Sequence, residues 1–439
     1  MGVKVVKFGG SSLADATQFA KVKSIIKSDP ARAYVVPSAP GKRCDNDKKV
    51  TDMLYACYKQ ASAGEDCIKL LNEIKMRYLE IASDLKLDTP IDKAFERIEE
   101  DLQHGASVEY MASRGEYLCG MLLADYLGYA FIDATDVILF NEDGSFNAEA
   151  TNIILSRHLK NLTHAVIPGF YGSYPDGRIH TFTRGGSDIS GAIVARAAGA
   201  ELYENWTDVC GFLMVDPHVV PSAVEIANIT YKELRELSYM GARVLHEDSV
   251  FPVHRAGIPT NIRNTNLPEH PGTMIQVNPL ENEQNPYTIT GIAGKRGFTV
   301  ISIEKAMMNA ELGFGKRVLQ VLEENRISFE HLPTGIDTLC VIVSTETLAP
   351  CRETVISRIV ELTEPDTISI QDGLALVSTV GRGMVRNCGT AAKLFGAMSH
   401  AGVNVRMIDQ GSSELSIIVG VNDCDMETTM RAIYSEFVK

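Results

Sequence analysis

The sequence predicts an α/β protein: a mostly parallel sheet sandwiched by helices, followed by two smaller αβ domains. The first observation is a short apolar strand at residues 3–8 that ends in a glycine turn and continues into a helix. The second is a further strand, turn and helix at residues 34–54, because two such units in tandem favour βαβ winding. The third is an internal repeat after residue 290, and 439 residues leave room for two or three domains.

The composition excludes several classes of protein. A net charge of −14 disfavours a general nucleic-acid or anionic-membrane surface, although a local loop can still bind a nucleotide. No apolar run is long enough to cross a membrane and no signal peptide is recognisable, so we expect a cytoplasmic protein. The 9 cysteines are odd in number and form no Cys-x-x-Cys pair, which indicates reduced thiols and no metal site.

The first glycine turn has the composition of an anion site. Gly9 and Gly10 follow the strand, and the helix predicted from Ala14 to Ile26 begins just beyond Ser11. Backbone N–H groups without side chains can approach phosphate oxygens there, and Lys7 adds a positive charge. The Walker pattern is absent from the chain. The structural alternative is a tight strand-to-helix corner.

The second unit has a strand at residues 34–36, a turn at residues 37–42 and a helix that begins near Val50. Ligands of such sheets bind at the carboxyl ends of the strands. Residues 61–104 follow as amphipathic helices without recognisable chemistry, and we interpret them as a cover or a partner-facing hairpin.

Two interpretations apply to Ser113-Arg114-Gly115-Glu116. Ser-x-x-Glu before an apolar run is typical of a capping box, in which both side chains bind backbone donors at the start of a helix. In the functional interpretation, Glu116 faces a substrate ammonium at the rim of the sheet.

A second glycine turn, Arg184-Gly185-Gly186-Ser187-Asp188, precedes an alanine-rich helix. In the structural interpretation, Asp188 is a plain N-cap. In the functional one, Arg184 is a bidentate partner for a substrate carboxylate, and Asp188 holds Lys7 or orders the surroundings of the donor phosphate.

The next segments complete the first domain. A strand at residues 201–209 runs into a polar turn, and its tryptophan, Trp206, is expected in the core. Residues 238–246 contain a helix with Arg243 and His246, and such a histidine is typically structural. Residues 259–264 form the last strand of the sheet, and the segment 267–287, rich in Pro, Asn and Glu, is the predicted domain boundary.

The C-terminal part is an internal repeat. A constant shift aligns Gly313 with Gly389 and the apolar stretch 339–343 with 415–419, without a gap. Each copy has the pattern of a strand, a glycine-containing turn, a helix, a strand, a hairpin and a strand. The repeats carry no nucleophile, metal cluster or acid pair, so we interpret them as regulatory.

Five ordered motifs and this doubled tail resemble the aspartokinases, members of the amino acid kinase superfamily with two C-terminal ACT domains. The lysine-sensitive, monofunctional type is the most similar. The resemblance covers essentially the whole chain. It implies a catalytic domain at 1–285 and ferredoxin-like ACT domains of the βαββαβ type at 290–366 and 370–439, and it leaves open whether the two ACT domains interleave. The motifs are Lys7-Phe8-Gly9-Gly10-Ser11-Ser12, Ser113-Arg114-Gly115-Glu116, Arg184-Gly185-Gly186-Ser187-Asp188, Trp206-Thr207-Asp208-Val209 and Gly241-Ala242-Arg243-Val244-Leu245-His246.

The resemblance implies transfer of the ATP γ-phosphoryl group to the side-chain carboxylate of L-aspartate. The product, 4-phospho-L-aspartate, begins lysine, threonine and methionine synthesis. A carboxylate is already a nucleophile near neutral pH, so catalysis requires alignment and charge stabilisation, not a general base. The implied cofactor is ATP with Mg²⁺, the ion being held mainly by the phosphates.

The resemblance also implies roles for individual residues. Lys7 and Asp188 are the catalytic residues. The implied nucleotide contacts are Lys7, Gly9, Gly10, Ser11, Thr207, Asp208, Leu213, His218, Arg243 and Val244. The implied substrate contacts are Ser38, Thr51, Glu116, Arg184 and Ser187.

The chain departs from the family pattern at several of these positions. Leu213 replaces an aromatic residue, His218 an arginine and Arg243 a lysine, and these changes concern nucleotide affinity. Glu247 and Pro37 are further departures. Asp216 is interpreted as a loop cap.

For the tail, the resemblance implies an inhibitory amino acid bound at the turn and the hairpin of the first repeat. Lysine is the expected inhibitor, and threonine remains open. The implied effector contacts, for which ordinary packing is the alternative, are Met308, Glu311, Phe314, Gly315 and Asp337. A homodimer through the ACT domains is implied, and pairing of dimers into tetramers is open.

Two other functions remain possible from the sequence. One is a kinase of another acidic amino acid, such as glutamate or N-acetylglutamate; Arg184 with Glu116 suits a free α-amino acid. The other is a catalytically weak amino-acid sensor, against which the presence of Lys7 and Asp188 argues.

Overall fold

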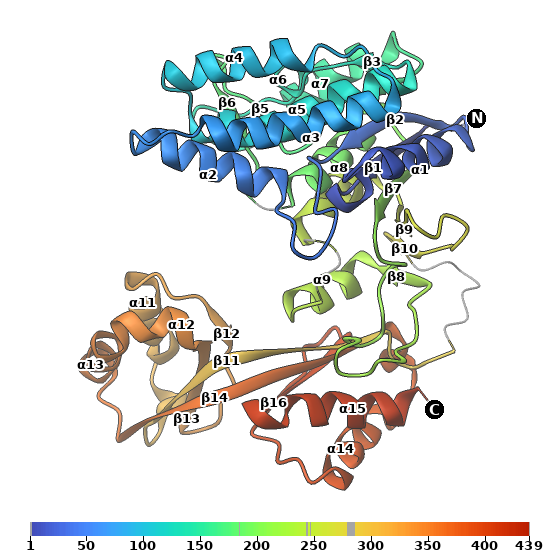
Figure 1. Ribbon diagram of the computed structural model, residues 1–439. Helices are drawn as coiled ribbons and strands as arrows, with labels where there is room; N and C mark the ends of the chain where they lie inside the picture. Colours follow the sequence, from blue (N-terminus) through green and yellow to red (C-terminus); the bar gives the residue numbers. More distant parts are fainter. Residues whose placement is uncertain (1, 184, 243–244, 246, 279–285, 439) are drawn as a thin grey trace. The chain divides into compact units, whose positions relative to one another are not determined.

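The computed structural model describes residues 2–183, 185–242, 245, 247–278 and 286–438 (Figure 1). The chain forms two compact units. The N-terminal unit contains Met1–Phe212, Ala227–Tyr231 and Arg243–Glu281. The C-terminal unit contains Leu213–Ile226, Lys232–Ala242 and Asn282–Lys439.

The N-terminal unit is built on an eight-stranded sheet with the order β3-β4-β2-β1-β7-β9-β10-β8. Its strands are β1 (Lys4–Phe8), β2 (Arg32–Pro37), β3 (Ala130–Phe131), β4 (Ala165–Val166), β7 (Leu202–Thr207), β8 (Asn228–Thr230), β9 (Thr260–Asn264) and β10 (Thr273–Gln276). β1 pairs in parallel with β2 and β7, and β10 runs antiparallel to β9. The predicted mostly parallel sheet is therefore confirmed.

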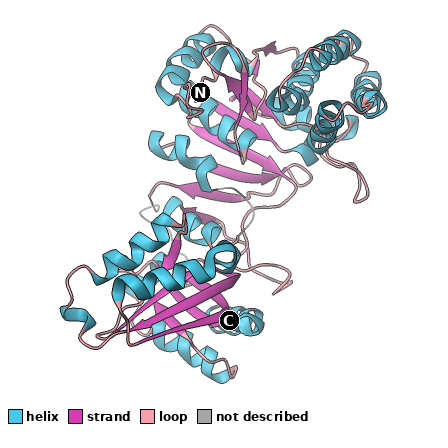
Figure 2. Ribbon diagram, turned by 90° about the vertical axis from the view of Figure 1, so that its left-hand side faces the viewer, coloured by secondary structure: helices cyan, strands magenta, loops and turns pink. Residues whose placement is uncertain are grey.

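Helices cover both faces of this sheet (Figures 1 and 2). They are α1 (Ala16–Lys27), α2 (Val50–Ser62), α3 (Ile68–Leu85), α4 (Ile91–Gln103), α5 (Val108–Leu127), α6 (Ala134–Val137), α7 (Ala148–Lys160), α8 (Gly186–Ala198) and α10 (Phe251–Ala256), with 3-10 turns η1 (Gly10–Leu13) and η2 (Glu247–Val250). A small hairpin, β5 (Tyr171–Ser173) and β6 (Ile179–Thr181), completes the unit. The predicted helical stretch at 61–104 corresponds to α3 and α4.

Hydrophobic periodicity explains the core under these helices. α1 buries Phe19, Val22, Ile25 and Ile26, the residues with helical spacing in the sequence. They join one apolar cluster with residues of α2 to α5 and with Trp206, which is 1% exposed. The core position expected for Trp206 is confirmed.

Two predicted boundaries in this part of the chain are wrong. β9 is not the last strand, because β10 lies inside the segment interpreted as a linker and buries Thr273 and Ile275. The four residues of β10 are too few to show a recognisable strand pattern within a segment that is rich in Pro, Asn and Glu. The helix predicted at 238–246 ends at Tyr239, where α9 (Tyr231–Tyr239) stops before Gly241 at φ 108°. Arg243, Val244 and His246 lie outside the described residues.

The C-terminal unit is built on a six-stranded sheet with the order β12-β13-β11-β14-β16-β15. Its strands are β11 (Gly291–Glu304), β12 (Phe329–His331), β13 (Thr338–Ser344), β14 (Thr367–Val380), β15 (Met407–Asp409) and β16 (Ser416–Asn422). Its helices and 3-10 turns are η3 (Met308–Ala310), α11 (Phe314–Glu324), α12 (Thr345–Leu348), η4 (Ala349–Cys351), α13 (Arg352–Thr363), η5 (Arg382–Arg386), α14 (Thr390–His400), η6 (Asp423–Asp425) and α15 (Met426–Phe437).

The repeat predicted from the sequence is present. β11 and β14, the opening strands of the two copies, lie side by side as an antiparallel pair (Figure 1). Each copy continues with a helix, an edge strand, an inner strand and a further helix. Because the opening strand of each copy pairs with that of the other, neither copy has a complete sheet without its twin.

None of the helices in the described part of the chain is both long and apolar enough to cross a membrane.

Candidate active site

A partly buried ion pair lies where three elements of the N-terminal unit meet. Lys7 Nζ, at the end of β1, lies 2.6 Å from Asp188 Oδ1 in the first turn of α8. Asn205, on the neighbouring strand β7, donates from Nδ2 to the same carboxylate at 2.8 Å and accepts from Lys7 Nζ at 3.4 Å. The three side chains therefore form a closed polar triangle at the sheet.

Asn205 was missed by the sequence reasoning. It is the direct neighbour of Lys7 across the parallel pair β1–β7, and it is 2% exposed. Buried amides in strands need polar partners, so an asparagine within a strand of the predicted sheet was a usable signal.

The loops that follow β1 and β2 meet backbone to backbone. Gly41 N donates to Gly10 O at 2.7 Å. A Cβ on Gly10 would lie 2.7 Å from Ala39 O, and a Cβ on Gly41 would lie 2.6 Å from Gly10 C. Only glycine therefore fits at both positions. The sequence indicated the role of Gly10 but not that of Gly41.

The helix start at the first turn differs from the prediction. The chain leaves Gly9 as the 3-10 turn η1, and α1 begins only at Ala16. There Asp15 already caps α1, because its Oδ1 accepts from Gln18 N at 2.9 Å. The element that directly follows β1 and its Lys7 is therefore η1, not α1.

The second glycine turn is also held by close contacts. A Cβ on Gly186 would lie 2.5 Å from a ring carbon of Phe170, and a Cβ on Gly169 would lie 2.8 Å from Ser187. Gly185 is the N-cap residue of α8, at φ 58°, so the interpretation of Asp188 as a plain N-cap is wrong. The carboxylate of Asp188 is directed to Lys7 and Asn205 instead. Arg184 lies outside the described residues.

The capping-box interpretation of Ser113 and Glu116 is wrong. α5 begins at Val108, and Ser107 caps it by accepting from Tyr110 N at 3.1 Å. Ser113 and Glu116 lie inside this helix, where Ser113 Oγ donates to Tyr110 O at 2.6 Å. The motif had the right residues for a cap, but the helix starts before it.

Glu116 is a buried acid beside the loop that follows β2. It is 5% exposed, and its Oε2 has no hydrogen-bond partner among the described residues. Burial raises the pKa of the Glu116 carboxyl to about 8, against the opposing effect of the Ala39 N–H. α5 approaches this loop closely, since a Cβ on Gly115 would lie 2.8 Å from Ala39 Cβ.

The other predicted residues of this unit lie at the same edge of the sheet. Ser38 directly follows β2 and donates from N to Phe8 O at 3.0 Å. Thr51 lies in the first turn of α2, and Thr207 ends β7, where its Oγ1 donates to Asp208 Oδ1 at 3.2 Å. Because β1, β2 and β7 are parallel, their carboxyl ends share one edge.

Leu213 and His218 belong to the C-terminal unit. Asp216 Oδ1 accepts from His218 N at 2.8 Å and lies 2.9 Å from His218 Nδ1. The interpretation of Asp216 as a loop cap is therefore confirmed.

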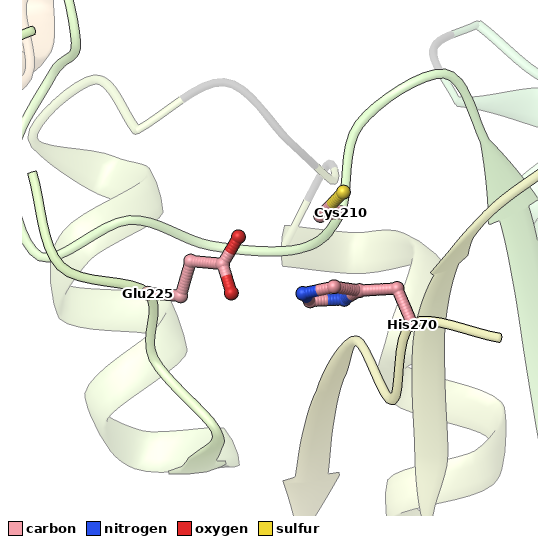
Figure 3. Close-up of side chains that lie close together, drawn as sticks. All are labelled: Cys210, Glu225 and His270. Carbon is pink, nitrogen blue, oxygen red and sulfur yellow. The ribbon is translucent and has the colours of Figure 1, made fainter. Parts of the chain in front are cut away.

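Residue types that bind soft metals also occur in the N-terminal unit. Figure 3 shows Cys210, after β7, and His270, before β10, with Cys210 Sγ within 4.8 Å of a ring nitrogen. Asn264 Nδ2 donates to Cys210 Sγ at 3.3 Å, and Gly272 N donates to His270 Nδ1 at 3.1 Å. Glu225, also labelled in Figure 3, belongs to the other unit. Two such residues are too few for a metal site.

The predicted effector segments are in contact within the C-terminal unit. Lys305 N donates to Asp337 O at 2.9 Å, and Met307 N donates to Asp337 Oδ1 at 2.8 Å. The side chains of Met308 and Phe314 are 5% and 3% exposed and belong to the core of this repeat. Their side chains therefore have the packing role that the sequence left open.

Glu311 has a different environment from these two residues. It pairs with Lys305 Nζ at 2.7 Å and with Arg317, and these cations lower the pKa of the carboxyl. Gly315 lies in the first turn of α11 with open space beside it.

Comparisons with known proteins agree with this arrangement. The model of the amino acid kinase family matches residues 2–264, and that of an ACT domain matches residues 377–437. Aspartokinase 3 of Bacillus subtilis is 40% identical over 454 residues, which cover 99% of this chain and 98% of that protein.

Solved structures are similar over the whole chain. The aspartate kinase of Clostridium acetobutylicum has 47% identity and a TM-score of 0.89, with 100% of both chains covered. Two structures of E. coli aspartokinase III, one with aspartate and ADP and one with lysine and aspartate, have 26% identity and TM-scores of 0.78 and 0.74, again with 100% of both chains covered. The chain therefore belongs to the amino acid kinase family, and within it to the aspartokinases, which are ATP-dependent kinases of aspartate.

Proposed function

We propose that phosphoryl transfer from ATP to the side-chain carboxylate of L-aspartate takes place at the carboxyl edge of the β1–β2–β7 sheet, with Lys7 and Asp188 as catalytic residues. The observation that carries this proposal is the contact of 2.6 Å between them, beside two glycine turns. Lys7 is 7% exposed, and a buried cation acts strongly on charge that develops nearby.

Each member of the polar triangle has a distinct task in this mechanism. The ammonium of Lys7 stabilises the negative charge that spreads over the oxygens of the transferring phosphoryl group. Asp188 holds that ammonium in place, and Asn205 orients the carboxylate of Asp188 through its hydrogen bond of 2.8 Å. No general base is required, because the attacking carboxylate is already ionised.

L-Aspartate is proposed to bind between the loop after β2 and the start of α8. Glu116 would receive the α-ammonium, and its support is a buried oxygen without a partner among the described residues. Arg184 would bind the α-carboxylate through its guanidinium fork. The remaining proposed substrate contacts are Ser38, Thr51 and Ser187.

The nucleotide is proposed to bind beside the first glycine turn and the end of β7. Support comes from the glycine turn, where a Cβ on Gly9 would lie 3.6 Å from Lys7 Nζ, and from the ADP present in the E. coli complex. The proposed contacts within the N-terminal unit are Gly9, Gly10, Ser11, Thr207, Asp208, Arg243 and Val244.

Mg²⁺ fits this site as an ion that the nucleotide brings with it. Its preferred ligands are oxygens, and Asp188 is the carboxylate beside Lys7, although its Oδ1 already contacts Lys7 and Asn205. The described residues offer no group of three acids or histidines around Lys7. The phosphates would therefore supply most of the ligands, and the bound ion would neutralise part of their charge.

The C-terminal repeats are proposed to bind an inhibitory amino acid, with lysine expected first and threonine second. Support comes from the contact of the turn with the hairpin and from the E. coli enzyme, which is lysine-sensitive and forms a complex with lysine. Met308 and Phe314 would contact it through their main chain, because their side chains are buried. The other proposed contacts are Glu311, Gly315 and Asp337.

Further parts of the proposal concern organisation. We place the catalytic domain at 1–285 and the ACT domains at 290–366 and 370–439, interleaved through β11 and β14. A cytoplasmic homodimer through the ACT domains, with pairing of dimers into tetramers left open, would provide the first step of lysine, threonine and methionine synthesis.

The test is ADP release with Mg-ATP and L-aspartate, with L-glutamate as the matched control substrate, in the presence and absence of lysine and threonine. We expect turnover that requires aspartate and decreases with lysine. Turnover unaffected by both amino acids would remove the regulatory proposal and keep the kinase. Absence of turnover with retained lysine binding would favour the amino-acid sensor.

A further inference from the structure

A cleft lies on the face of α5 that is turned away from the candidate active site. It has a volume of about 770 Å³ and lies between α4, the start of α5 and the β5–β6 turn. Arg114 lines it, whereas Glu116 does not. Two residues along a helix of 3.6 residues per turn project to nearly opposite sides, so α5 separates the cleft from Glu116.

Arg114 is a buried cation without a counter-ion among the described residues. It is 7% exposed, and its guanidinium lies 4.6 Å and 4.5 Å from the ring centroids of Tyr110 and Tyr117. Its Nε and one terminal nitrogen donate to Ser113 Oγ at 3.2 and 2.9 Å. No carboxylate in the described ranges of the chain lies within the ion-pair distance of 4.0 Å.

The acids on the walls of the cleft, Asp101, Asp133 and Glu109, contact groups other than Arg114, and Glu109 Oε1 lies 4.0 Å from His180 Nδ1. Asp101 accepts from the hydroxyl of Tyr110 and lies 3.8 Å from Arg97. Asp133 Oδ1 accepts from Tyr171 Oη at 2.9 Å and from Thr135 N at 3.0 Å.

The other cations of the cleft also have partners. Arg178 pairs with Asp176 at 2.6 Å, and Arg97 Nε lies 3.8 Å from Asp101 Oδ2. Taking a charge out of water is unfavourable unless an opposite charge is present, so Arg114 has an unused capacity for an anion.

The rest of the cleft is suited to an apolar body. Tyr110, Tyr117 and Tyr174 contribute aromatic rings, and Ile98 and Ile179 contribute aliphatic side chains. The hydroxyl of Tyr174 is bonded to His180 Nδ1 at 3.1 Å, so mainly its ring remains for a ligand. The volume is within the range of about 300–1,000 Å³ that small-molecule sites have.

We propose that this cleft is a second ligand site for a small molecule with a planar apolar body and one carboxylate or phosphate group. The anionic group pairs with the guanidinium of Arg114, whose planar donors match both anions. The body lies against the tyrosine rings and Ile98. The site does not depend on the proposed roles of Lys7, Glu116 or the ACT domains.

Phenyl phosphate and phenylacetate test the site on the full-length protein, with benzyl alcohol as the neutral analogue. Binding is measured by calorimetry and by saturation-transfer NMR. We expect at least one anion to bind, with benzyl alcohol at least ten-fold weaker. Binding of only one anion assigns the phosphate or the carboxylate class. Saturation by neither anion at millimolar concentration would overturn the proposal.

Variants locate the binding. Arg114→Gln is expected to lower the affinity for the anions at least ten-fold, to the level of benzyl alcohol, and Arg114→Lys less, because the charge remains without the planar fork. Ala106→Trp places a large side chain in the cleft and leaves Arg114 unchanged, so we expect it to prevent anion binding. This variant tests the proposal if Arg114→Gln does not fold. Kinase turnover should be retained in each folded variant. Anion binding that persists in Ala106→Trp would belong to another site and would overturn the proposal.

Discussion

Lys7 Nζ lies 2.6 Å from Asp188 Oδ1, and this contact joins the end of β1 to the first turn of α8. The two residues are far apart in the sequence, and each follows or enters a glycine turn. The ion pair keeps a positive charge at the sheet edge in a defined position before any ligand arrives. Preorganised charge of this kind stabilises a transition state without further rearrangement.

Lys7→Ala is expected to abolish most of the phosphoryl transfer and to retain lysine binding. Loss of one preorganised group of this kind lowers kcat by about 10²–10³-fold. ADP release and calorimetry with lysine measure the two properties. Lys4→Ala is the matched control, since Lys4 lies on the same strand and donates to Asp29 Oδ2 at 2.8 Å. Unchanged turnover in Lys7→Ala would exclude the catalytic role.

Asn205→Ala is expected to lower kcat by about ten-fold or more, the effect of losing a hydrogen bond to a charged group. The KM for ATP should change little, because Asn205 acts through Asp188. Steady-state kinetics separate the two constants. Asn205→Asp keeps the size but places a second carboxylate beside Asp188, so it should be slower still. An effect confined to KM would contradict a positioning role.

Because of Glu116, we expect kcat/KM for aspartate to depend on pH. The pKa of its carboxyl is raised to about 8, so the free enzyme carries it neutral at lower pH, and a bound ammonium favours the ionised form. kcat/KM for aspartate should therefore rise with pH and level off above about pH 8. In Glu116→Gln, kcat/KM for aspartate should not show this rise with pH. A profile shared by both proteins would show that another group titrates.

Because of the same Glu116 carboxyl, we expect the free energy of unfolding to depend on pH. Its folded pKa of about 8 lies above its ordinary value of 4.5, so between these values the unfolded chain binds fewer protons than the folded one. The stability of the wild-type protein relative to Glu116→Gln should decrease as the pH rises through this window. Urea unfolding at several pH values measures it; a difference independent of pH would refute the buried neutral acid.

Gly10→Ala is expected to lower the free energy of unfolding by about 1–3 kcal/mol, because the new Cβ would lie 2.7 Å from Ala39 O and force the two loops apart. Kinase activity should fall with it. Gly396→Ala is the control: it lies in α14 with no atom within 4 Å of its Cβ, and should be neutral or stabilising. Equal stability of both variants would mean that the loops can move apart freely.

Asp337→Ala is expected to weaken inhibition by lysine about ten-fold or more without changing uninhibited turnover, a typical size for a coupling between sites. The variant removes the bond of 2.8 Å that Met307 N donates to Asp337 Oδ1 at the proposed effector turn. Asp372→Ala is the control, since Asp372 pairs with Arg352 on another part of the same unit. Equal inhibition in both variants would place the effector elsewhere.

The sequence predicted more of the fold than of the site. The apolar spacing of Phe19, Val22, Ile25 and Ile26 indicated α1, and all four are buried. Lys7, Arg184 and Asp188 were recognised beside glycine turns, whereas Ser38, Thr51, Thr207 and Asp208 followed from the resemblance to the aspartokinases. The structural interpretations of Glu116 and Asp188 as caps failed, since a motif does not tell where its helix begins.

Local patterns therefore determined the strand-turn-helix units and the repeated tail, because hydrophobic periodicity is a property of neighbouring residues. Only the tertiary structure decided which side chains meet. Asn205 lies beside Lys7 because β1 pairs with β7, and Gly10 contacts Gly41 because the loops after β1 and β2 meet. The lack of a counter-ion for Arg114 among the described residues likewise depends on which side chains surround its guanidinium. Such contacts join segments distant in the chain, and their distances arise only when the sheet and its helices pack together.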